Sequence, residues 1–169
     1  FTLFSYMAPY FRQVLHASPE HISALFMWFG LFGLVGNVML TRWIDRIGPT
    51  RCVNLGLISM GLAFLAWQWV GSFWIAALVM VPWALGTFST NSAQQARLSA
   101  AAPAVATALL ALNTSAIYAG QALGAAGGGA IVAAGGFAPL GGVALAWVCA
   151  ALLVSILLAR RAARGRIDA

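Results

Sequence analysis

The chain has 169 residues, of which 62% are hydrophobic and 7% are charged. An ordinary soluble domain is roughly 45–50% apolar and ~25% charged, so this chain has too few charges to cover a surface in water. The net charge of +6 comes from nine arginines and no lysine, and these arginines lie between apolar stretches without forming a basic patch. Composition therefore excludes a soluble domain and argues against a nucleic-acid partner.

Six apolar stretches follow one another along the chain. They cover residues 1–11, 21–40, 52–70, 72–90, 107–134 and 140–159. A spanning helix needs about 20 residues, which the last five stretches supply. The first stretch is shorter and predicts a helix truncated by the start of the sequence. These long runs lack the alternation of barrel strands, so we expect an all-α membrane protein of six transmembrane helices.

Arginine gives the orientation of the predicted spans. Thr41–Arg51, Asn91–Ala106 and the tail 160–169 contain every arginine except Arg12. Cytoplasmic connectors of membrane proteins collect Arg and Lys, so these three segments are predicted to be cytoplasmic. We therefore expect a multi-pass protein of the inner or plasma membrane, with a cytoplasmic C-terminus.

Patterns for metals, disulfides and catalysis are missing from the sequence. Cys52 and Cys149 have no CxxC or Cys/His spacing, so neither a disulfide framework nor a metal site or other cofactor is predicted. A membrane-embedded hydrolase needs a nucleophile and a base facing each other across the spans. His16 and His21 both lie near the first connector, and no HExxH motif is present. An enzyme is not expected.

The first cytoplasmic connector, Thr41–Arg51, reads TRWIDRIGPTR. It resembles the Gly-x-x-x-Asp-Arg-x-Gly-Arg-Arg signature, motif A, which major facilitator transporters carry between their second and third helices and repeat between the eighth and ninth. Thr41 stands where the first glycine is usual, and Pro49 and Thr50 replace the arginine pair. The residues that carry the resemblance are Arg42, Asp45, Arg46, Gly48 and Arg51.

These residue types suit such a connector physically. Gly48 permits a tight turn, and arginines hold the connector at anionic headgroups. The carboxylate of Asp45 can bind the N-terminus of a neighbouring helix. A generic basic cytoplasmic loop would show a similar composition, and this alternative stays open.

Three further segments resemble the drug, sugar and purine efflux branch of the same superfamily. They are Gln95–Leu98 (QARL), Leu112–Ala116 (LNTSA) and Gly120–Gly124 (GQALG). The resemblance implies that the chain is the C-terminal six-helix half of a drug:proton antiporter-like transporter, comprising helices seven to twelve. It also implies an N-terminal six-helix partner half, a small-molecule substrate and protons as coupling ions.

In this family helices seven and ten line the central cavity and helix eleven flanks it, while nine and twelve face lipid. On that mapping the candidates for the cavity are Tyr6, Tyr10, Trp83, Thr87, Asn91, Asn113, Tyr118 and Gln121. Each of them could instead bond to a neighbouring helix. An apolar, aromatic and neutral-polar lining favours a small lipophilic or neutral polar substrate.

Gly120, Gly124 and Gly128 are spaced four apart in the fifth apolar stretch, residues 107–134. This small-xxx-small pattern lets helix backbones approach closely, so we predict a packed helix face, although glycine is also simply frequent in membrane helices.

Acidic residues are absent from the predicted spans. Glu20, Asp45 and Asp168 all lie in connectors or in the tail, so a titrating carboxylate for proton coupling is expected in the N-terminal half. Two alternatives remain: a six-span membrane protein that acts as a homodimeric transporter, and a structural or receptor-like membrane protein.

Overall fold

The computed structural model describes residues 1–164, and Arg166 and Asp168 of the expected tail lie outside them. In chain order the elements are the 3-10 turn η1 (Phe4–Tyr6), α1 (Met7–Gln13), α2 (Pro19–Ile47), α3 (Pro49–Ala66), the 3-10 turn η2 (Trp67–Trp69), α4 (Phe73–Ala101), the 3-10 turn η3 (Pro103–Val105), α5 (Ala106–Gly135) and α6 (Leu140–Arg164). Five helices, α2 to α6, are long and apolar enough to cross a membrane. The predicted all-α membrane fold is confirmed.

The helices are longer than the apolar stretches. Most of the predicted connector Thr41–Arg51 is helical, because α2 continues to Ile47 and α3 begins at Pro49. The predicted connector Asn91–Ala106 is likewise helical as far as Ala101. Hydropathy marks where a helix leaves lipid, whereas its backbone hydrogen bonds can continue through polar residues that favour helix. The sequence interpretation of these two segments as loops is therefore wrong.

Local sequence explains where several helices begin. The Ser18 hydroxyl accepts a hydrogen bond from the His21 N–H, and Pro19 stands at the first helical position of α2. The Ser72 hydroxyl caps α4 in the same way through the N–H of Ile75. Ser at the N-cap and Pro at the first position both favour a helix start.

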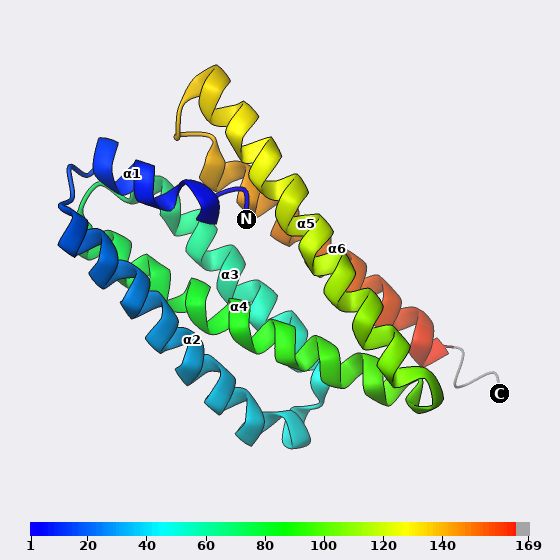
Figure 1. Ribbon diagram of the computed structural model, residues 1–169. Coiled ribbons are helices and arrows are strands. Elements are labelled where there is room, and N and C mark those ends of the chain that lie inside the picture. Colours follow the sequence, from blue (N-terminus) through cyan, green and yellow to red (C-terminus); the bar gives the residue numbers. More distant parts are fainter. Residues whose placement is uncertain (165–169) are drawn as a thin grey trace.

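The helices form two layers (Figure 1). α1, α2, α4 and α5 lie toward the viewer, and α3 and α6 lie behind them. The most extensive contacts join α3 to α4, α2 to α4 and α3 to α6, so α3 lies between α4 and α6. α5 is much less covered, and Gly128 is its one buried residue. α4 is thus the central helix of the front layer.

Glycines let α4 approach its neighbours closely. A Cβ added at Gly36 of α2 would lie 2.6 Å from the carbonyl oxygen of Leu85 on α4. A Cβ at Gly86 of α4 would collide with the carbonyl oxygen of Gly56 on α3. The backbones of α2, α3 and α4 therefore nearly touch at these points.

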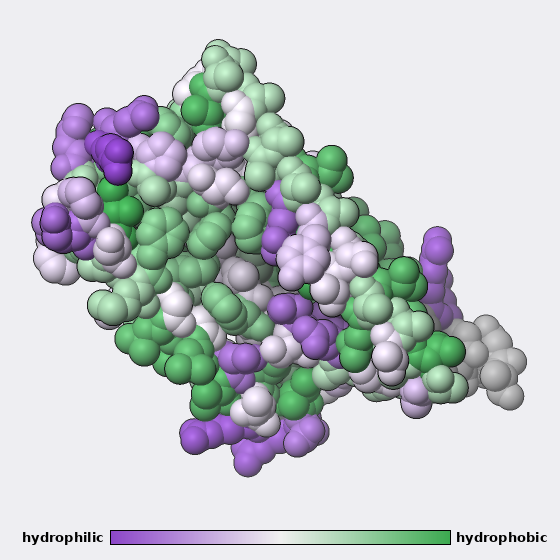
Figure 2. All heavy atoms as spheres, in the orientation of Figure 1, coloured by the Kyte–Doolittle hydropathy of each residue, from purple (hydrophilic) through white to green (hydrophobic). Residues whose placement is uncertain are grey.

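Connections gather at two opposite ends of the bundle. The α2–α3 turn, the α4–α5 turn and the end of α6 lie at one end, and the α1–α2, α3–α4 and α5–α6 connections lie at the other (Figure 1). We call the first the arginine-rich end, because it carries Arg42, Arg46, Arg51, Arg97, Arg160, Arg161 and Arg164. Figure 2 shows hydrophilic side chains over the α2–α3 turn and hydrophobic ones over most of the helices.

Candidate functional site

The predicted cavity residues come from three parts of the front layer. Tyr6 and Tyr10 belong to η1 and α1, Trp83, Thr87 and Asn91 to α4, and Asn113, Tyr118 and Gln121 to α5. α1, α4 and α5 all belong to the layer that faces the viewer in Figure 1. In the same view, Figure 2 shows hydrophilic side chains between α4 and α5 on an otherwise mostly hydrophobic face. Their individual environments differ, and they separate into structural and open positions.

The two tyrosines near the start of the chain hold the fold together. The Tyr6 hydroxyl donates to the carbonyl oxygen of Ala125 on α5 at 2.7 Å. The Tyr10 hydroxyl donates to the carbonyl oxygen of Val70, between η2 and α4, at 2.8 Å. Tyr10 is buried, and its ring centroid lies 5.4 Å from that of Trp67. Both hydroxyl protons are thus committed to backbone carbonyls within the chain.

Trp83 lies in the hydrophobic core. Only 3% of it is exposed. Its ring lies edge-on to four other aromatic rings at centroid distances between 4.9 and 6.1 Å, those of Phe4, Phe29, Phe64 and Trp67. Aromatic neighbours from η1, α2, α3 and η2 cover Trp83 in this chain, so its side chain contributes to the core.

The remaining residues of the α4 face are polar and more accessible. The Thr87 hydroxyl donates to the carbonyl oxygen of Trp83 at 2.8 Å, one helical turn earlier. Asn91 is exposed, and its amide oxygen accepts a hydrogen bond from Gln95 at 3.3 Å. Asn91 and Gln95 therefore form a neutral polar pair, of which the sequence interpretation included only Asn91.

On α5 the three candidates differ in exposure. Tyr118 is 65% exposed, and Gln121 is half-buried. The amide nitrogen of Asn113 is buried and has no hydrogen-bond partner among residues 1–164. Asn91, Gln95, Tyr118 and Gln121 thus have accessible side chains on α4 and α5, and among the described residues none of the four has a hydrogen bond to another helix.

The motif A-like residues surround the α2–α3 turn. Gly48 alone separates the two helices, with φ +81° and ψ 153°. Arg42, Asp45, Arg46 and Arg51 are all exposed. Within the described residues the Asp45 carboxylate has neither a hydrogen bond nor an ion pair, so its proposed contact with a helix N-terminus is not made inside this half of the bundle.

The predicted glycine face of α5 is only partly in contact. A Cβ at Gly124 would lie 3.1 Å from the backbone nitrogen of Thr2, and one at Gly128 would collide with the carbonyl oxygen of Thr2 and meet the Tyr6 ring. Gly120 has nothing within 4 Å, whereas Gly129 also approaches the Tyr6 hydroxyl. The close approach is therefore to the start of the chain, and it excludes Gly120.

Two polar links between helices were missed by the sequence analysis. The Ser92 hydroxyl donates to the amide oxygen of Asn37 at 2.7 Å, joining α4 to α2. A second link joins Arg97, Ser155 and Asn54 on α4, α6 and α3. The asparagines stand out as polar residues within apolar stretches, but their partners lie too far along the chain to be recognised from one sequence.

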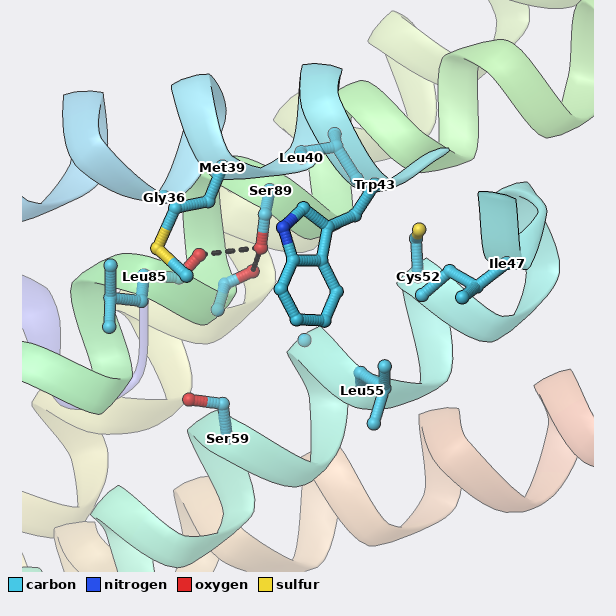
Figure 3. A pocket seen from close by; sticks show the side chains of 12 residues that line it. Gly36, Met39, Leu40, Trp43, Ile47, Cys52, Leu55, Ser59, Leu85 and Ser89 are labelled. Carbon is cyan, nitrogen blue, oxygen red and sulfur yellow. Dashed lines mark hydrogen bonds between the residues drawn. The ribbon is translucent and has the colours of Figure 1, made fainter. Parts of the chain in front are cut away.

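A cavity of about 220 Å³ lies between α2, α3 and α4 near the Gly48 turn, and Trp43, Leu55 and Ser89 are among the residues that line it (Figure 3). Its two hydroxyls are already used, since Ser59 donates to the carbonyl oxygen of Pro82 and Ser89 to that of Leu85. None of the predicted cavity residues lines it. The space is an apolar pocket separate from the polar face of α4 and α5.

Comparison of the sequence with models of known protein families identifies the family of this chain. The model of the Major Facilitator Superfamily matches residues 1–168. The chain belongs to the Major Facilitator Superfamily. This membership confirms the resemblance seen in the α2–α3 turn.

Curated relatives within the superfamily are membrane transport proteins. The chain is 32% identical over 168 residues to the inner membrane transport protein YdhP of Escherichia coli K12, covering 95% of this chain and 42% of the relative. It is 25% identical over 127 residues to a probable sugar efflux transporter of Haemophilus influenzae 86-028NP, covering 74% and 31%. No solved structure matches the chain significantly. This Major Facilitator Superfamily chain thus spans less than half the length of the curated relatives it matches.

Proposed function

We propose that the chain is the C-terminal six-helix half of a proton-coupled efflux transporter for a small lipophilic or neutral polar molecule. Its share of the E. coli relative, 42%, fits one half of a two-half transporter. Relatives named as sugar efflux transporters support export as the direction of transport. The two halves would rock about a site between them, as in alternating access.

The observation that carries this proposal is the chemistry of the front face. Its accessible polar groups, Asn91, Gln95, Tyr118 and Gln121, are neutral donors and acceptors. They lie on α4 and α5 among apolar side chains, without an acidic residue in either helix. Such a surface can bind hydroxyl or amide groups and apolar surface, whereas a strongly charged molecule would lose its hydration there without a counter-charge.

The acidic residues of the described part lie at the ends of α2. Glu20 is in its first turn and Asp45 near its last, and both are exposed. A proton carrier needs a group that changes charge within the membrane. We therefore place the titrating carboxylate in the N-terminal half, and the arginine-rich end of the bundle on the cytoplasmic side.

The test uses the full-length transporter in inverted vesicles, with a radiolabelled alkyl thiogalactoside as a neutral probe. Asn91→Ala combined with Tyr118→Ala should raise KM by about fivefold or more, because each lost neutral hydrogen bond is worth ~1 kcal/mol. Glu20→Gln, Asp45→Asn and Asp168→Asn together should leave the pH dependence of transport unchanged. Gln68→Ala, an exposed residue of η2, is the control for KM.

Two results would refute the proposal. An unchanged KM in the Asn91/Tyr118 variant would remove this face from the substrate site. Loss of the pH dependence with probe binding intact in the triple variant would place the proton carrier in this half.

A further inference from the structure

Arg97 belongs to a polar chain that joins three helices near the arginine-rich end. Its Nη1 donates to the Ser155 hydroxyl at 2.9 Å, and that hydroxyl donates to the amide oxygen of Asn54 at 2.7 Å. Ser155 is only 7% exposed, so the link is internal. Arg97 itself is half-buried, and within residues 1–164 no carboxylate pairs with it. Its charge is thus held beside neutral partners.

A charge in that position needs compensation. Removing a guanidinium from water is costly unless it is paired, and one bond to a hydroxyl leaves its other N–H groups without a charged acceptor. An anion that enters from outside the chain would supply both the counter-charge and the acceptors.

The structure provides a space for such an anion. A groove of about 480 Å³ runs between α3, α4 and α6, and Arg97 lines it together with Gln94 and Thr90. These three side chains follow one another on one face of α4. The Thr90 hydroxyl oxygen is buried and has no hydrogen-bond partner among the described residues. That oxygen packs against Gly56 of α3, so Arg97 and Gln94 are the polar side chains of this wall that a ligand in the groove can reach.

The other walls are apolar and open to the outside of the bundle. Trp147, Val154 and Leu158 of α6 line the groove and are 66%, 54% and 50% exposed. In a helix that crosses a bilayer such side chains face lipid tails. Arg97 lies seven residues beyond Thr90, where the apolar stretch of α4 ends, which is about 10 Å along the helix axis and at the level of the polar headgroups.

We infer that this groove binds an anionic phospholipid, with its phosphate at Arg97 and Gln94 and an acyl chain along Val154 and Trp147, which extend from the level of the Arg97–Ser155 bond into the bilayer. A free anion would gain nothing from the apolar walls, and a lipid tail alone would leave Arg97 without a counter-charge. The site is distinct from the polar face of α4 and α5, and it does not depend on the proposed efflux activity.

Thermal unfolding of the purified full-length protein in detergent tests the inference. Phosphatidylglycerol should raise the unfolding midpoint more than phosphatidylcholine with the same acyl chains, and inorganic phosphate at equal concentration should have no effect. Arg97→Gln should weaken the apparent affinity for phosphatidylglycerol about fivefold, the equivalent of ~1 kcal/mol per basic group at a membrane surface. Arg160→Gln, an exposed residue near the end of α6, is the matched control.

A second variant covers the case in which Arg97→Gln does not fold. Ala151→Trp fills the groove from α6 without removing any member of the polar chain, and it should abolish the preference for phosphatidylglycerol. Equal responses of wild type, Arg97→Gln and Ala151→Trp would overturn the inference. So would equal stabilisation by the two phospholipids, and a matching shift with inorganic phosphate would identify a free-anion site in place of a lipid site.

Discussion

Gly48 is the one residue between two membrane-spanning helices. Its backbone, with φ +81° and ψ 153°, lies in a region that only glycine occupies at low cost. A Cβ at this position would meet nothing within 4 Å, so the constraint comes from the backbone and not from crowding. The requirement for glycine at this place in the motif A-like sequence therefore has a local physical cause.

Replacing Gly48 with Ala should destabilise the protein by about 1–3 kcal/mol, the usual cost of a strained backbone conformation. A lowered thermal midpoint of the full-length protein in detergent measures it. Gly30→Ala is the matched control, because Gly30 lies inside α2 with nothing within 4 Å of an added Cβ. The thermal unfolding midpoint of this variant should stay the same or rise, since Ala favours helix more than Gly does. Equal unfolding midpoints for the two variants would contradict the claim that the backbone conformation at Gly48 is strained for any other residue.

Residue types could be predicted from the sequence more readily than residue roles. The helix start at Ser18–Pro19 and the turn at Gly48 depend only on neighbouring residues, so they can be predicted from the sequence. Tyr10 and Trp83 are predicted as cavity residues from their type and their helix, but whether such a side chain faces a cavity depends on residues far along the chain. Phe64 and Val70, for example, decide where these two side chains point.

At the scale of elements, α4 owes its central place to small residues on itself and on its neighbours. Gly36 lets α2 pack closely against α4 at Leu85. Gly56 on α3 and Gly86 on α4 face each other and let these two helices pack closely. Without strong hydrophobic attraction between helices in lipid, such close packing is a main source of association.

Gly86→Ala should therefore disturb the α3–α4 contact. The added methyl group would collide with the Gly56 carbonyl oxygen and lie 2.7 Å from Met60 Cγ. Overpacking of this kind costs typically ~1–3 kcal/mol, and we expect a lower yield of folded protein by size-exclusion chromatography. Gly61→Ala on α3, whose Cβ would lie an ordinary 3.7 Å from Val148, should behave like wild type. A normal yield for Gly86→Ala would mean that the two helices can separate without loss.

The sequence located the long helices but not their contacts or their ends. Apolar length is a property of one segment, so five spanning helices could be found directly. The glycine pattern predicts a packed face on α5, yet a close approach of two helix backbones occurs at Gly56 and Gly86, which no regular spacing connects. Contacts between helices depend on crossing positions that a single sequence does not contain.

At the scale of the whole molecule, charge and connectivity agree. The two turns and the end of α6, which together carry most of the arginines, lie at one end of the bundle, as alternate crossing of the membrane requires (Figure 1). Arg12 lies at the opposite end, in the last turn of α1. This separation supports the proposed cytoplasmic position of the arginine-rich end.

Cysteine labelling of intact cells checks that orientation. In a Cys149→Ser background, Gly71→Cys at the α3–α4 connection should react with a membrane-impermeant maleimide, since Gly71 is exposed and lies at the end with few arginines. Thr50→Cys and Arg160→Cys should react only after the membrane is permeabilised. The reverse pattern would invert the assigned topology.

The chain of hydrogen bonds through Asn54, Ser155 and Arg97 also bears on how the protein is made. Ser155 follows Asn54 by 101 residues, so at ~5–20 residues per second its synthesis comes roughly 5–20 s later. α3 enters the bilayer before its amide has this partner, and it is less apolar than α6, with a mean hydropathy of 1.4 against 2.5. α6, which is made later, therefore completes the polar bonding of α3, and a ribosome that stalls before α6 leaves the Asn54 amide oxygen in the membrane without this donor.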